Sequence, residues 1–407
     1  MLLLLHGRPI GVLHTGPEGC TASELARLCL DQHGWAIARH LAADQIALGS
    51  GRPAGAPDSL DDLLNFPAAC HDAAPPRTAV TVAVCTRNRS TQLAECLEAL
   101  LALDYPADLL DILVVDNAPS DDSTRRTVAA YPRIRYACEP RPGLDWARNR
   151  AILESRADII AYTDDDVSVE RNWVRALASA FRDEPEAMCV TGLVVPDEVD
   201  THAQALFERY GGFGRGFERG LFRVDVQRGH SAARVFGGTG RFGTGANMAF
   251  RREFFSEAGL FDPALDVGTP TNGGGDLDMF FRVLKSGRAL LYEPAAIVRH
   301  RHRREYAALK TQIANNGIGF YAYLVRIAST YPDERAAVIA LGVWWLWWWN
   351  MRRLLASFVR TGKVPRDLIV AELKGSFVGL RRYAAARKHA ADVARRYGAP
   401  EPAGADA

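Results

Sequence analysis

The chain has 407 residues, more than one domain of typical size, so about two or three domains are expected. Its 49 Lys and Arg residues nearly balance its 48 Asp and Glu residues, and the formal net charge is +1. This balance excludes a general electrostatic attraction to nucleic acid, and no nucleic-acid partner is expected.

Seven cysteines are widely spaced along the chain and include no C-x-x-C pair. They predict buried free thiols in a reducing compartment, and neither a disulfide framework nor a zinc site. The N-terminus, MLLLLHGRPIG, has no basic leader and too short an apolar core for a signal peptide. A cytoplasmic protein is therefore expected.

Residues 1–70 predict a small N-terminal appendage, α/β or helical, because Leu25, Leu28, Ile37 and Leu41 recur at helical spacing. The Pro- and Ala-rich residues 71–77 predict a linker. The expected remainder is a larger domain at 78–305, a helical region at 306–397 and a disordered tail at 398–407.

Strand and helix patterns alternate from residue 79 onward. Apolar runs at 79–85, 111–116 and 158–163 predict strands, and the intervening 90–103 and 143–155 predict helices. This order is typical of right-handed βαβ units and a mostly parallel sheet flanked by helices, an α/β (Rossmann-like) class.

The second half of the larger domain has its own elements. Residues 243–255 predict a Gly-rich loop, a short strand and a helix, and a further helix ends at Gly287. Strands are expected at 289–293 and 296–300. The stretch GTGRFG (238–243) fits G-x-G-x-x-G, but it leads into a strand where a helix should open, so dinucleotide binding is rejected.

Three acids, Asp164, Asp165 and Asp166, directly follow the apolar run DIIAYT. Carboxylates at the carboxyl end of a parallel strand, where open sheets bind ligands, predict a site for Mn²⁺ or Mg²⁺. The alternative is a solvated turn in which one acid caps the next helix.

The ends of the first two strands carry further polar groups. Thr86, Arg87 and Arg89 precede a helix and suit the ribose and phosphates of a nucleotide; helix capping with solvated arginines is the alternative. Asp116 and Asn117 are suited to a base or sugar edge, and an Asx-turn is the alternative.

Later residues add a basic group and a candidate base. Arg148 is placed on a helix to reach a phosphate, with surface salt bridging as the alternative. Asp276 in GGGDLD opens a helix and is placed to accept a proton from a hydroxyl, and it is also suited to capping that helix. His300 and His302 are expected on one side of a strand, near a metal or diphosphate, or on a solvated basic face.

The succession of these motifs resembles the glycosyltransferase 2 family, whose members have the GT-A fold, over roughly residues 78–305. The motifs in chain order are VAVCTRNR, LVVDN, ARNRAI, YTDDDV, GTGANMAFRREFFSEAGLFD, GGGDLDMFFR and YEPAAIVRHRHRR. The resemblance implies a nucleotide-diphosphate sugar as donor, a divalent metal and inversion at the anomeric carbon.

The resemblance also implies residue roles. Asp276 would be the catalytic base, with Asp278 and Arg282 the rest of its motif. Asp166 would bind the metal most directly, Asp164 would lie nearer the ribose, and His300 is a metal or diphosphate candidate. The nucleotide would contact Thr86, Arg87, Arg89, Asp116, Asn117, Arg148, Asp164 and Asp165. Many members have Glu-Asp where this chain has Gly275-Asp276, which leaves acceptor binding to another residue.

The C-terminal region has sixteen uncharged residues at 336–351, including five tryptophans. This stretch is short of the roughly twenty residues that a membrane-spanning helix needs. Residues 351–389 carry a local charge of +8, from ten Lys and Arg against two acids. These features suit docking on an anionic membrane surface, or else a Trp-rich helix buried against the domain or a second subunit.

The sequence therefore predicts an inverting, metal-dependent glycosyltransferase of the hexosyl-transferring type, cytoplasmic and with peripheral membrane association left open. It has no Q-x-x-R-W motif, and a single transfer to a lipid-linked or saccharide acceptor is expected. Two alternatives remain, a sugar-phosphate nucleotidyltransferase and a catalytically silent module that binds sugar nucleotides or membranes.

Overall fold

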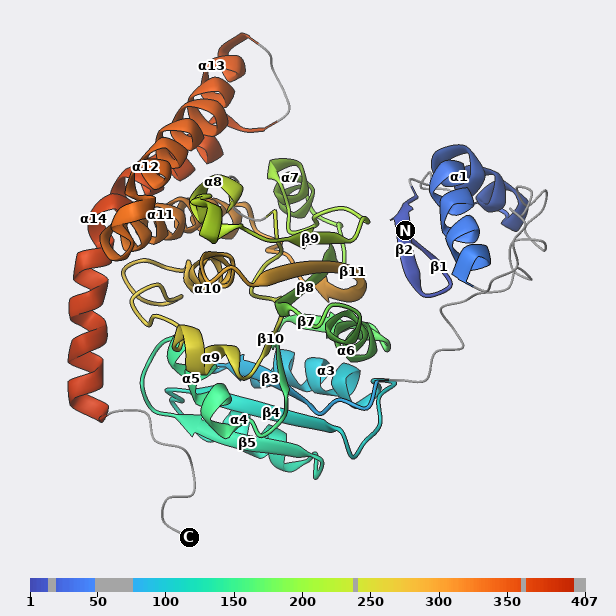
Figure 1. The fold of residues 1–407 in the computed structure, drawn as a ribbon, viewed down its shortest axis with the longest axis horizontal. Helices are drawn as coiled ribbons and strands as arrows, with labels where there is room; N and C mark the ends of the chain where they lie inside the picture. Colours follow the sequence, from blue (N-terminus) through green and yellow to red (C-terminus); the bar gives the residue numbers. More distant parts are fainter. Residues whose placement is uncertain (14–19, 48–75, 237–240, 360–363, 399–407) are drawn as a thin grey trace. The chain divides into compact units, whose positions relative to one another are not determined.

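The computed structural model describes residues 1–13, 20–47, 76–236, 241–359 and 364–398 (Figure 1). The chain divides into two compact units, Met1–Pro76 with Gly216–Arg219, and Arg77–Arg215 with Gly220–Ala407. Most of the predicted linker and all but Gly398 of the predicted tail lie outside the described residues.

The N-terminal unit is a β-hairpin and a helix. Strands β1 (Leu2–Leu5) and β2 (Arg8–Val12) pair antiparallel, and α1 spans Ala22–Ala47. The apolar side chains that recur at helical spacing on α1 pack with those of the hairpin into a small core; its buried members are Leu5, Leu13, Cys29, Ile37 and Leu41. The expected α/β character of the N-terminal segment is present.

The larger unit is built on one sheet with the strand order β5-β4-β3-β6-β10-β8-β11-β7, and β9 pairs with β11. The bounds are β3 Val80–Thr86, β4 Leu110–Asn117, β5 Ile134–Glu139, β6 Ile159–Asp164, β7 Val167–Val169, β8 Ala187–Pro196, β9 Gly220–Phe222, β10 Asn247–Arg251 and β11 Ala289–His300. The four strands β5, β4, β3 and β6, which are neighbours in this order, are parallel to one another. Strand β10 is antiparallel to both of its neighbours, β6 and β8.

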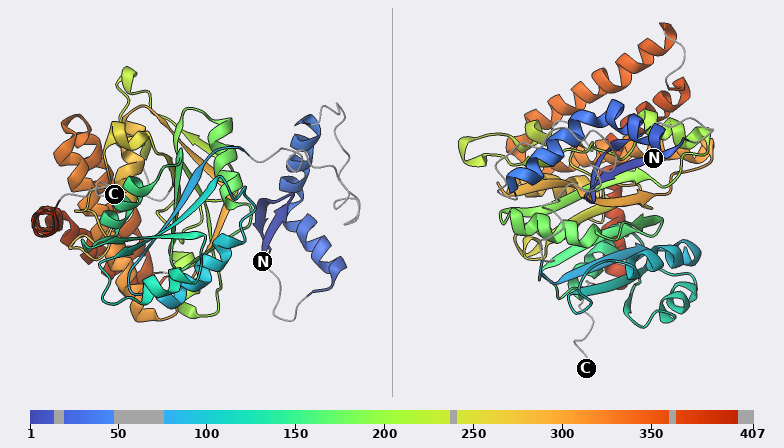
Figure 2. Two further views of the ribbon diagram at one scale, coloured as in Figure 1. Left: turned by 90° about the horizontal axis from the view of Figure 1, so that it is seen from below. Right: turned by 90° about the vertical axis from the view of Figure 1, so that its right-hand side faces the viewer.

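The parallel strands are apolar along nearly their whole length because both faces of the sheet are covered. Side chains of β3 alternate between two cores: Ala83 belongs to one, and Val82 and Val84 belong to the other. Helix α5 packs in the first core, and α3 and α6 pack in the second (Figure 2). The predicted α/β class, a sheet flanked by helices, is confirmed.

The helices of this domain are short. Their bounds are α3 Ser90–Leu101, α4 Ser123–Ala129, α5 Leu144–Glu154, α6 Trp173–Asp183, α7 His202–Tyr210, α8 Ala232–Phe236, α9 Phe254–Ala258 and α10 Gly275–Lys285, with a 3₁₀ turn η1 at Val226–Arg228. The predicted helices at 90–103 and 143–155 correspond to α3 and α5.

One strand prediction was wrong. The stretches 289–293 and 296–300 were expected as two strands, but they form the single strand β11. Its pairing with β8 jumps between Glu293 and Ile297, on either side of Pro294. Proline cannot donate to a sheet ladder and is accommodated at such irregularities, so the chain bulges here without ending the strand.

The C-terminal region is helical, as expected. Its elements are α11 Tyr306–Thr330, a 3₁₀ turn η2 Pro332–Glu334, α12 Arg335–Trp344, a π-helical segment η3 Trp345–Met351, α13 Arg352–Val359 and α14 Arg366–Tyr397. The continuous arm α12–η3–α13 extends away from the sheet (Figure 1). None of the helices that the structure describes is both long and apolar enough to cross a bilayer.

Helices α11 and α14 lie side by side because glycines let their backbones approach closely. A Cβ atom added to Gly317 would lie 2.4 Å from the carbonyl oxygen of Glu372 on α14. A Cβ atom added to Gly375 or Gly379 of α14 would lie 2.1 and 2.4 Å from carbonyl oxygens of α11. Larger residues at these three positions would force the helices apart.

Candidate active site

Two carboxylates and a histidine meet at the edge of the sheet. Asp164 ends β6, Asp166 lies in the turn before β7, and His300 ends β11, which pairs with β7. One ligand atom from each lies within 4.8 Å of the others, and His300 Nε2 is 3.5 Å from an Asp166 carboxylate oxygen. We call these three residues the strand-edge cluster.

The electrostatics of the strand-edge cluster fit a divalent cation. Burial and the neighbouring Asp166 raise the pKa of Asp164 to about 7, against the opposing effect of Arg148. Burial lowers the pKa of His300 to about 4, so its imidazole is neutral at physiological pH and can offer a lone pair. A cation would relieve the repulsion between the acids, and the two carboxylates are donors that suit Mn²⁺ or Mg²⁺.

His302 supports the strand-edge cluster from outside it. Its Nδ1 lies 3.2 Å from Nδ1 of His300, and its Nε2 lies 2.8 Å from Glu208 Oε1 on α7. Such a chain of hydrogen bonds fixes the ring orientation of a metal-binding histidine. Of the two histidines predicted near the metal, His300 belongs to the cluster and His302 positions it.

Asp165 is not a member of the strand-edge cluster. It is buried, accepts a hydrogen bond from Thr86 Oγ1 at 2.7 Å and pairs with Arg89 at 2.9 Å. Arg89 also reaches Asp166 at 3.4 Å. The predicted nucleotide contacts Thr86, Arg89 and Asp165 thus bind one another and join β3 to the turn that carries Asp166, whereas Arg87 is exposed.

The end of β4 shapes a neighbouring loop. Asn117 Nδ2 donates to the carbonyl oxygen of Arg141 at 2.7 Å, and Asn117 Oδ1 accepts from the amide of Gly143 at 2.9 Å. Asp116 is buried and accepts from the Tyr136 hydroxyl at 3.0 Å. Both polar atoms of the Asn117 side-chain amide are therefore engaged by the backbone of a distant loop, which is not the local Asx-turn weighed as the alternative.

Arg148 is buried on α5, which rules out the surface salt bridge considered as its alternative role. Its Nη1 donates to Asp145 Oδ1 at 3.0 Å, one helical turn earlier. Burial raises the pKa of Asp145 to about 7 even though Arg148 opposes the shift. No described residue donates to Asp145 Oδ2.

Asp145 occupies the space of the side chain that Gly275 lacks. A Cβ atom added to Gly275 would lie 2.0 Å from Asp145 Oδ2. A glutamate at position 275 cannot coexist with this arrangement, and a carboxylate from α5 stands in its place. Asp145 was not predicted as a site residue, although its position three residues before Arg148 puts both on one helix face.

Asp276 opens α10 beside this group. Its Oδ2 accepts from the amide of Gly245 at 2.9 Å, and its Oδ1 accepts from the amide of Leu277 at 2.9 Å. Gly274, and not Asp276, is the N-cap residue of α10, so Asp276 accepts from a first-turn amide from within the helix. Each carboxylate oxygen retains a second lone pair, so Asp276 remains able to accept a proton.

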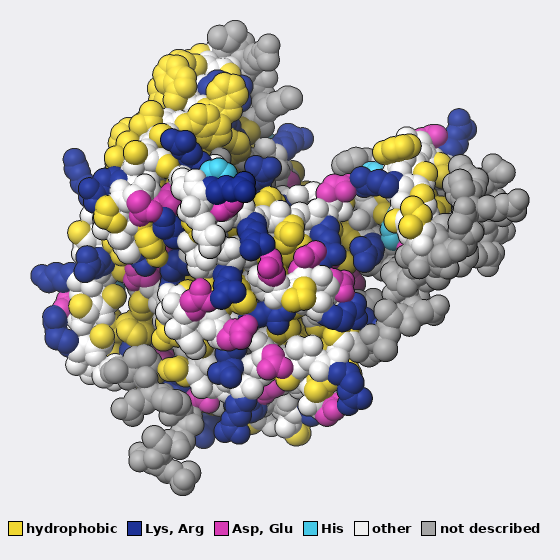
Figure 3. Space-filling view, viewed as in Figure 1, with side chains coloured by type: hydrophobic (Ala, Val, Ile, Leu, Met, Phe, Trp, Pro, Cys, Tyr) yellow, Lys and Arg dark blue, Asp and Glu magenta, His cyan; other side chains and the backbone are white. Residues whose placement is uncertain are grey.

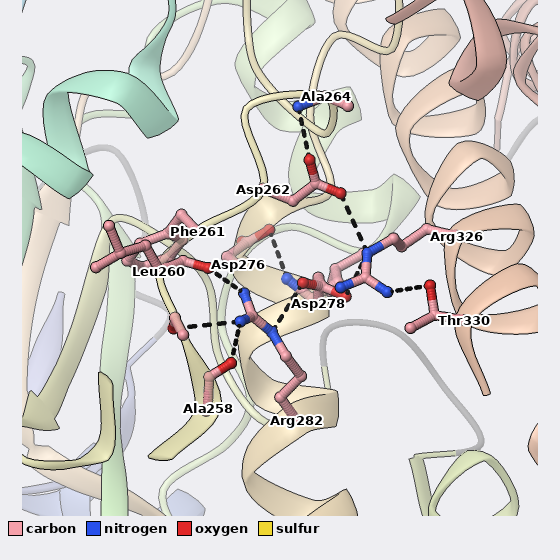
Figure 4. Close-up of polar contacts among 12 residues, drawn as sticks. Ala258, Leu260, Phe261, Asp262, Ala264, Asp276, Asp278, Arg282, Arg326 and Thr330 are labelled. Atoms are coloured by element: carbon pink, nitrogen blue, oxygen red, sulfur yellow. Dashed lines mark hydrogen bonds and ion pairs between the residues drawn. The ribbon is translucent and has the colours of Figure 1, made fainter. Parts of the chain in front are cut away.

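Asp278 and Arg282 hold α10 in place and do not line the cavity (Figure 4). Asp278 is fully buried, 2.9 Å from Arg282 Nε and 3.6 Å from Arg326 Nε on α11. Arg282 also donates to the carbonyl oxygens of Ala258 and Leu260 at 2.8 and 2.9 Å. The network fixes the helix that carries Asp276.

A cavity of about 700 Å³ joins the acids to the C-terminal arm. Its polar side is lined by Asp145, Arg148, Asp164 and Asp276, and its loops include residues 243–246 and 272–275. This volume lies within the range of about 300–1,000 Å³ that ligand pockets occupy.

The opposite side of the cavity is aromatic. Trp344, Trp345, Trp348 and Trp349 line it together with Tyr210. Trp345 and Trp349 stack with ring centroids 5.1 Å apart, and Arg353 lies 4.3 Å from the Trp349 ring. Four of the five tryptophans thus line the cavity, and Trp344, Trp347 and Trp348 are exposed to solvent. The group is therefore neither wholly buried against the domain nor wholly on the surface.

The cysteine prediction holds in part. The cysteines that the structure describes are free, but Cys20 and Cys138 are exposed, not buried as expected.

Residues 81–259 match the family model "Glycosyl transferase family 2". The chain is 26% identical over 237 residues to a glucosyl-dolichyl phosphate glucuronosyltransferase of Haloferax volcanii, covering 54% of this chain and 69% of that protein. It is 26% identical over 265 residues to a pre-mycofactocin glycosyltransferase of Mycobacterium tuberculosis, covering 65% of this chain and 50% of that protein. The chain thus spans about half to two thirds of these curated relatives.

Among solved structures, the chain is similar to a mannosyltransferase of Pyrobaculum calidifontis in complex with GDP-mannose and Mn²⁺, with a TM-score of 0.44 and 20% identity over 90% of this chain and 88% of that one. The family match covers the strands that carry Thr86, Asp116 and the three consecutive acids. Residues 81–259 thus belong to glycosyltransferase family 2, and the chain is a glycosyltransferase.

Proposed function

We propose that the protein transfers a sugar from a nucleoside-diphosphate sugar to an acceptor hydroxyl, with metal assistance and inversion at the anomeric carbon. The observation that carries this proposal is the cavity in which Asp276, a candidate base, lies with Asp164 of the strand-edge cluster. When bound by Asp164, Asp166 and His300, Mn²⁺ or Mg²⁺ supplies positive charge for the leaving diphosphate.

Asp276 accepts the proton of the attacking hydroxyl as the bond to the anomeric carbon forms. The amides of Gly245 and Leu277 keep its carboxylate directed into the cavity. Arg148 and Arg89 provide fixed positive charge near the acids, and Arg148 is well suited to stabilise the departing diphosphate because it is buried in the cavity wall.

Asp145 takes the position of the glutamate that Gly275 replaces and orients the acceptor. Its Oδ2 is buried at the cavity without a donor from any described residue, so it can accept a hydrogen bond from an acceptor hydroxyl. The paired Arg148 holds Oδ1 and fixes the rotamer.

In this proposal the acceptor is a lipid-linked sugar. Its sugar end lies by the acids, and its apolar part lies along the tryptophans. Apolar side chains gather on the α12–η3–α13 arm (Figure 3). The exposed ones are Ile339, Val343, Trp344, Trp347, Trp348, Leu355 and Phe358. The name of the Haloferax relative, a glucosyl-dolichyl phosphate glucuronosyltransferase, supports this acceptor class.

The same arm suits peripheral attachment to the cytoplasmic face of a membrane. Arg352 is exposed and lies over the Trp348 ring of this apolar surface, 4.5 Å from its centroid. Tryptophans and cations together bind the interface of anionic bilayers.

The two alternative functions have less support. A nucleotidyltransferase is expected to have a Gly-rich basic loop after its first strand, but Thr86 to Ser90 contain no glycine. A silent binding module would lack a base, whereas Asp276 lies in the cavity.

The test is a screen of UDP-, GDP- and dTDP-sugars for Mn²⁺-dependent thermal stabilisation and for transfer to a polyprenyl-phosphate-linked sugar. We expect Asp276→Asn to bind the donor and lower transfer by about 10²–10⁴-fold. Asp392→Asn, an exposed acid on α14, is the matched control and should transfer normally. Unchanged transfer by Asp276→Asn would refute the base assignment, and failure of every donor to bind would refute the proposed reaction.

A further inference from the structure

A second group of histidine and carboxylate side chains lies in the N-terminal unit. His6 lies in the turn between β1 and β2, and His40 and Asp44 lie one helical turn apart on α1. His6 Nδ1 is 2.7 Å from Asp44 Oδ2, and His40 Nε2 is 3.3 Å from both of these atoms. We propose that these three residues, the hairpin cluster, bind a divalent cation of the zinc class.

The distances fit three corners of a tetrahedron. Nitrogen and oxygen ligands about 2.0–2.2 Å from a zinc ion lie about 3.3–3.6 Å apart in tetrahedral geometry. The two 3.3 Å edges that end at His40 Nε2 already have that length. Only the 2.7 Å edge between His6 and Asp44 has to lengthen, by less than one ångström. Two imidazoles and one carboxylate are a common zinc ligand set, with one position left for water or substrate.

The backbone at His6 is a second indication. His6 has φ of +49° and the next residue, Gly7, has φ of +74°, as a two-residue hairpin turn requires. Glycine adopts this conformation at no steric cost, whereas it is uncommon for residues that carry a side chain. A histidine held there by the turn directs its ring at Asp44, so the ring has a role that the turn alone does not explain.

The cluster is enclosed, and the ring of His40 can be neutral. The side chains of His6, His40 and Asp44 are only 10%, 11% and 9% exposed. Burial lowers the pKa of His40 below its ordinary value, although Asp44 opposes this, so the ring can act as a ligand at neutral pH. Arg8, whose charge also disfavours protonation of His40, is exposed to solvent.

A cation at this site would join the hairpin to the helix. The described core of the N-terminal unit has few apolar side chains, and small units commonly rely on a metal for stability. Without a metal, the same triangle is two imidazole N–H groups that share one carboxylate oxygen. The two situations differ in metal affinity and in the effect of substitutions at His6.

The test uses the full chain in an Asp166→Ala background, so that the strand-edge cluster does not contribute. After treatment with EDTA, each protein is titrated with Zn²⁺ and with Co²⁺, whose visible absorption reports tetrahedral coordination. We expect one tight site, with Zn²⁺ affinity at least about 100-fold weaker in His40→Ala and in His6→Asn. His389→Ala, which removes an exposed histidine from α14, should bind like the parent.

His6→Gly gives a reading that does not depend on affinity. Glycine suits the turn but removes the hydrogen bond from His6 to Asp44, so the EDTA-treated parent and variant give a reference difference in unfolding temperature. Zn²⁺ should shift this difference in favour of the parent, because only the parent gains stability from the bound ion. The proposal is overturned if the parent binds Zn²⁺ no more tightly than His40→Ala and His6→Asn, or if Zn²⁺ leaves the difference unchanged.

Discussion

The strand-edge cluster and the hairpin cluster contain the same types of side chain in different surroundings. Asp164 connects the strand-edge cluster to the cavity, and Glu208 and His302 support it from behind. The members of the hairpin cluster face one another between a turn and a helix. The strand-edge cluster adjoins a cavity that can hold a substrate, whereas the three ligands of the hairpin cluster leave a fourth position that water can fill. The surroundings, more than the ligands, separate the two roles.

Crossed substitutions should separate the two clusters most strongly. Asp166→Ala removes a ligand of the catalytic cation, and we expect transfer to fall by at least about 10³-fold, since such an ion contributes several kcal/mol. Zn²⁺ binding at the hairpin cluster should persist. Asp44→Ala should lose that binding and transfer normally. The two variants are compared by Mn²⁺-dependent donor binding and by titration with Zn²⁺. If each variant lost both kinds of binding equally, the two clusters would not be independent metal sites.

Asp145→Asn probes one of the acids that line the cavity beside the strand-edge cluster. We expect transfer to fall about 10–100-fold with a raised KM for the acceptor, because the side chain orients that substrate. Donor-dependent stabilisation by Mn²⁺ should remain. Adding Gly275→Glu to Asp145→Asn should not restore transfer fully, because Arg148 still pairs with residue 145 and not with a glutamate at position 275. An unchanged acceptor KM in Asp145→Asn would contradict the orienting role.

His302→Ala tests the support of the strand-edge cluster. Loss of a residue that orients a metal ligand typically weakens metal binding about 10–100-fold. We expect a shift of this size in the Mn²⁺ concentration for half-maximal transfer, with kcat largely restored at saturating Mn²⁺. His302→Gln, which can keep one hydrogen bond, should recover part of the affinity. A uniform loss of kcat at all Mn²⁺ concentrations would indicate a merely structural role.

The raised pKa of Asp145 predicts how stability depends on pH. In the metal-free protein this carboxyl has a pKa of about 7, against an ordinary 3.8, so the folded state binds more protons than the unfolded state between these values. Stability from this group is therefore present below about pH 4 and is lost as the pH rises through 7. With EDTA present, Asp145→Asn should unfold at a temperature higher by about 1–3 °C at pH 8 and unchanged near pH 4. A constant difference would contradict the shift.

The smallest effect is expected for the outer face of the arm. Trp347→Ala removes an exposed ring that does not line the cavity, and Trp348→Ala removes one that does. Both should weaken flotation with anionic vesicles several-fold, but only Trp348→Ala should raise the KM for a lipid-linked acceptor. Failure of the unmodified protein to float would exclude membrane attachment, and Zn²⁺ binding should be unaffected throughout.

The sequence was sufficient for the parallel core of the fold. Strands such as Val80–Thr86 are continuous apolar runs, and their polar ends mark the binding edge directly. The antiparallel half was harder to predict, because Pro294 interrupts the pattern of β11 while a bulge preserves the strand. A local pattern does not reveal whether a neighbouring strand will accommodate a proline.

The site was predictable where its residues are adjacent in the sequence. Asp164 and Asp166 lie two residues apart after a strand, and that spacing indicated a metal. The side-chain direction of Asp165, toward Thr86, depends on the turn and was not predictable. Asp145 fills the space beside Gly275, although the two residues are 130 positions apart in the sequence. His6 and His40 are 34 positions apart. Only the folded chain brings each pair together.

The glycines that join α11 to its neighbours have a consequence for related enzymes. The backbone of Gly319 on α11 lies against Gly273 and Gly274, in the loop that leads to Asp276, just as Gly317 lies against α14. A relative with a bulkier residue at any of these contacts must move its C-terminal helices outward from the base. The width of the cavity limits the size of the acceptor that an enzyme can glycosylate. We therefore expect the residues at these glycine positions in an aligned sequence to predict the acceptor size of each relative.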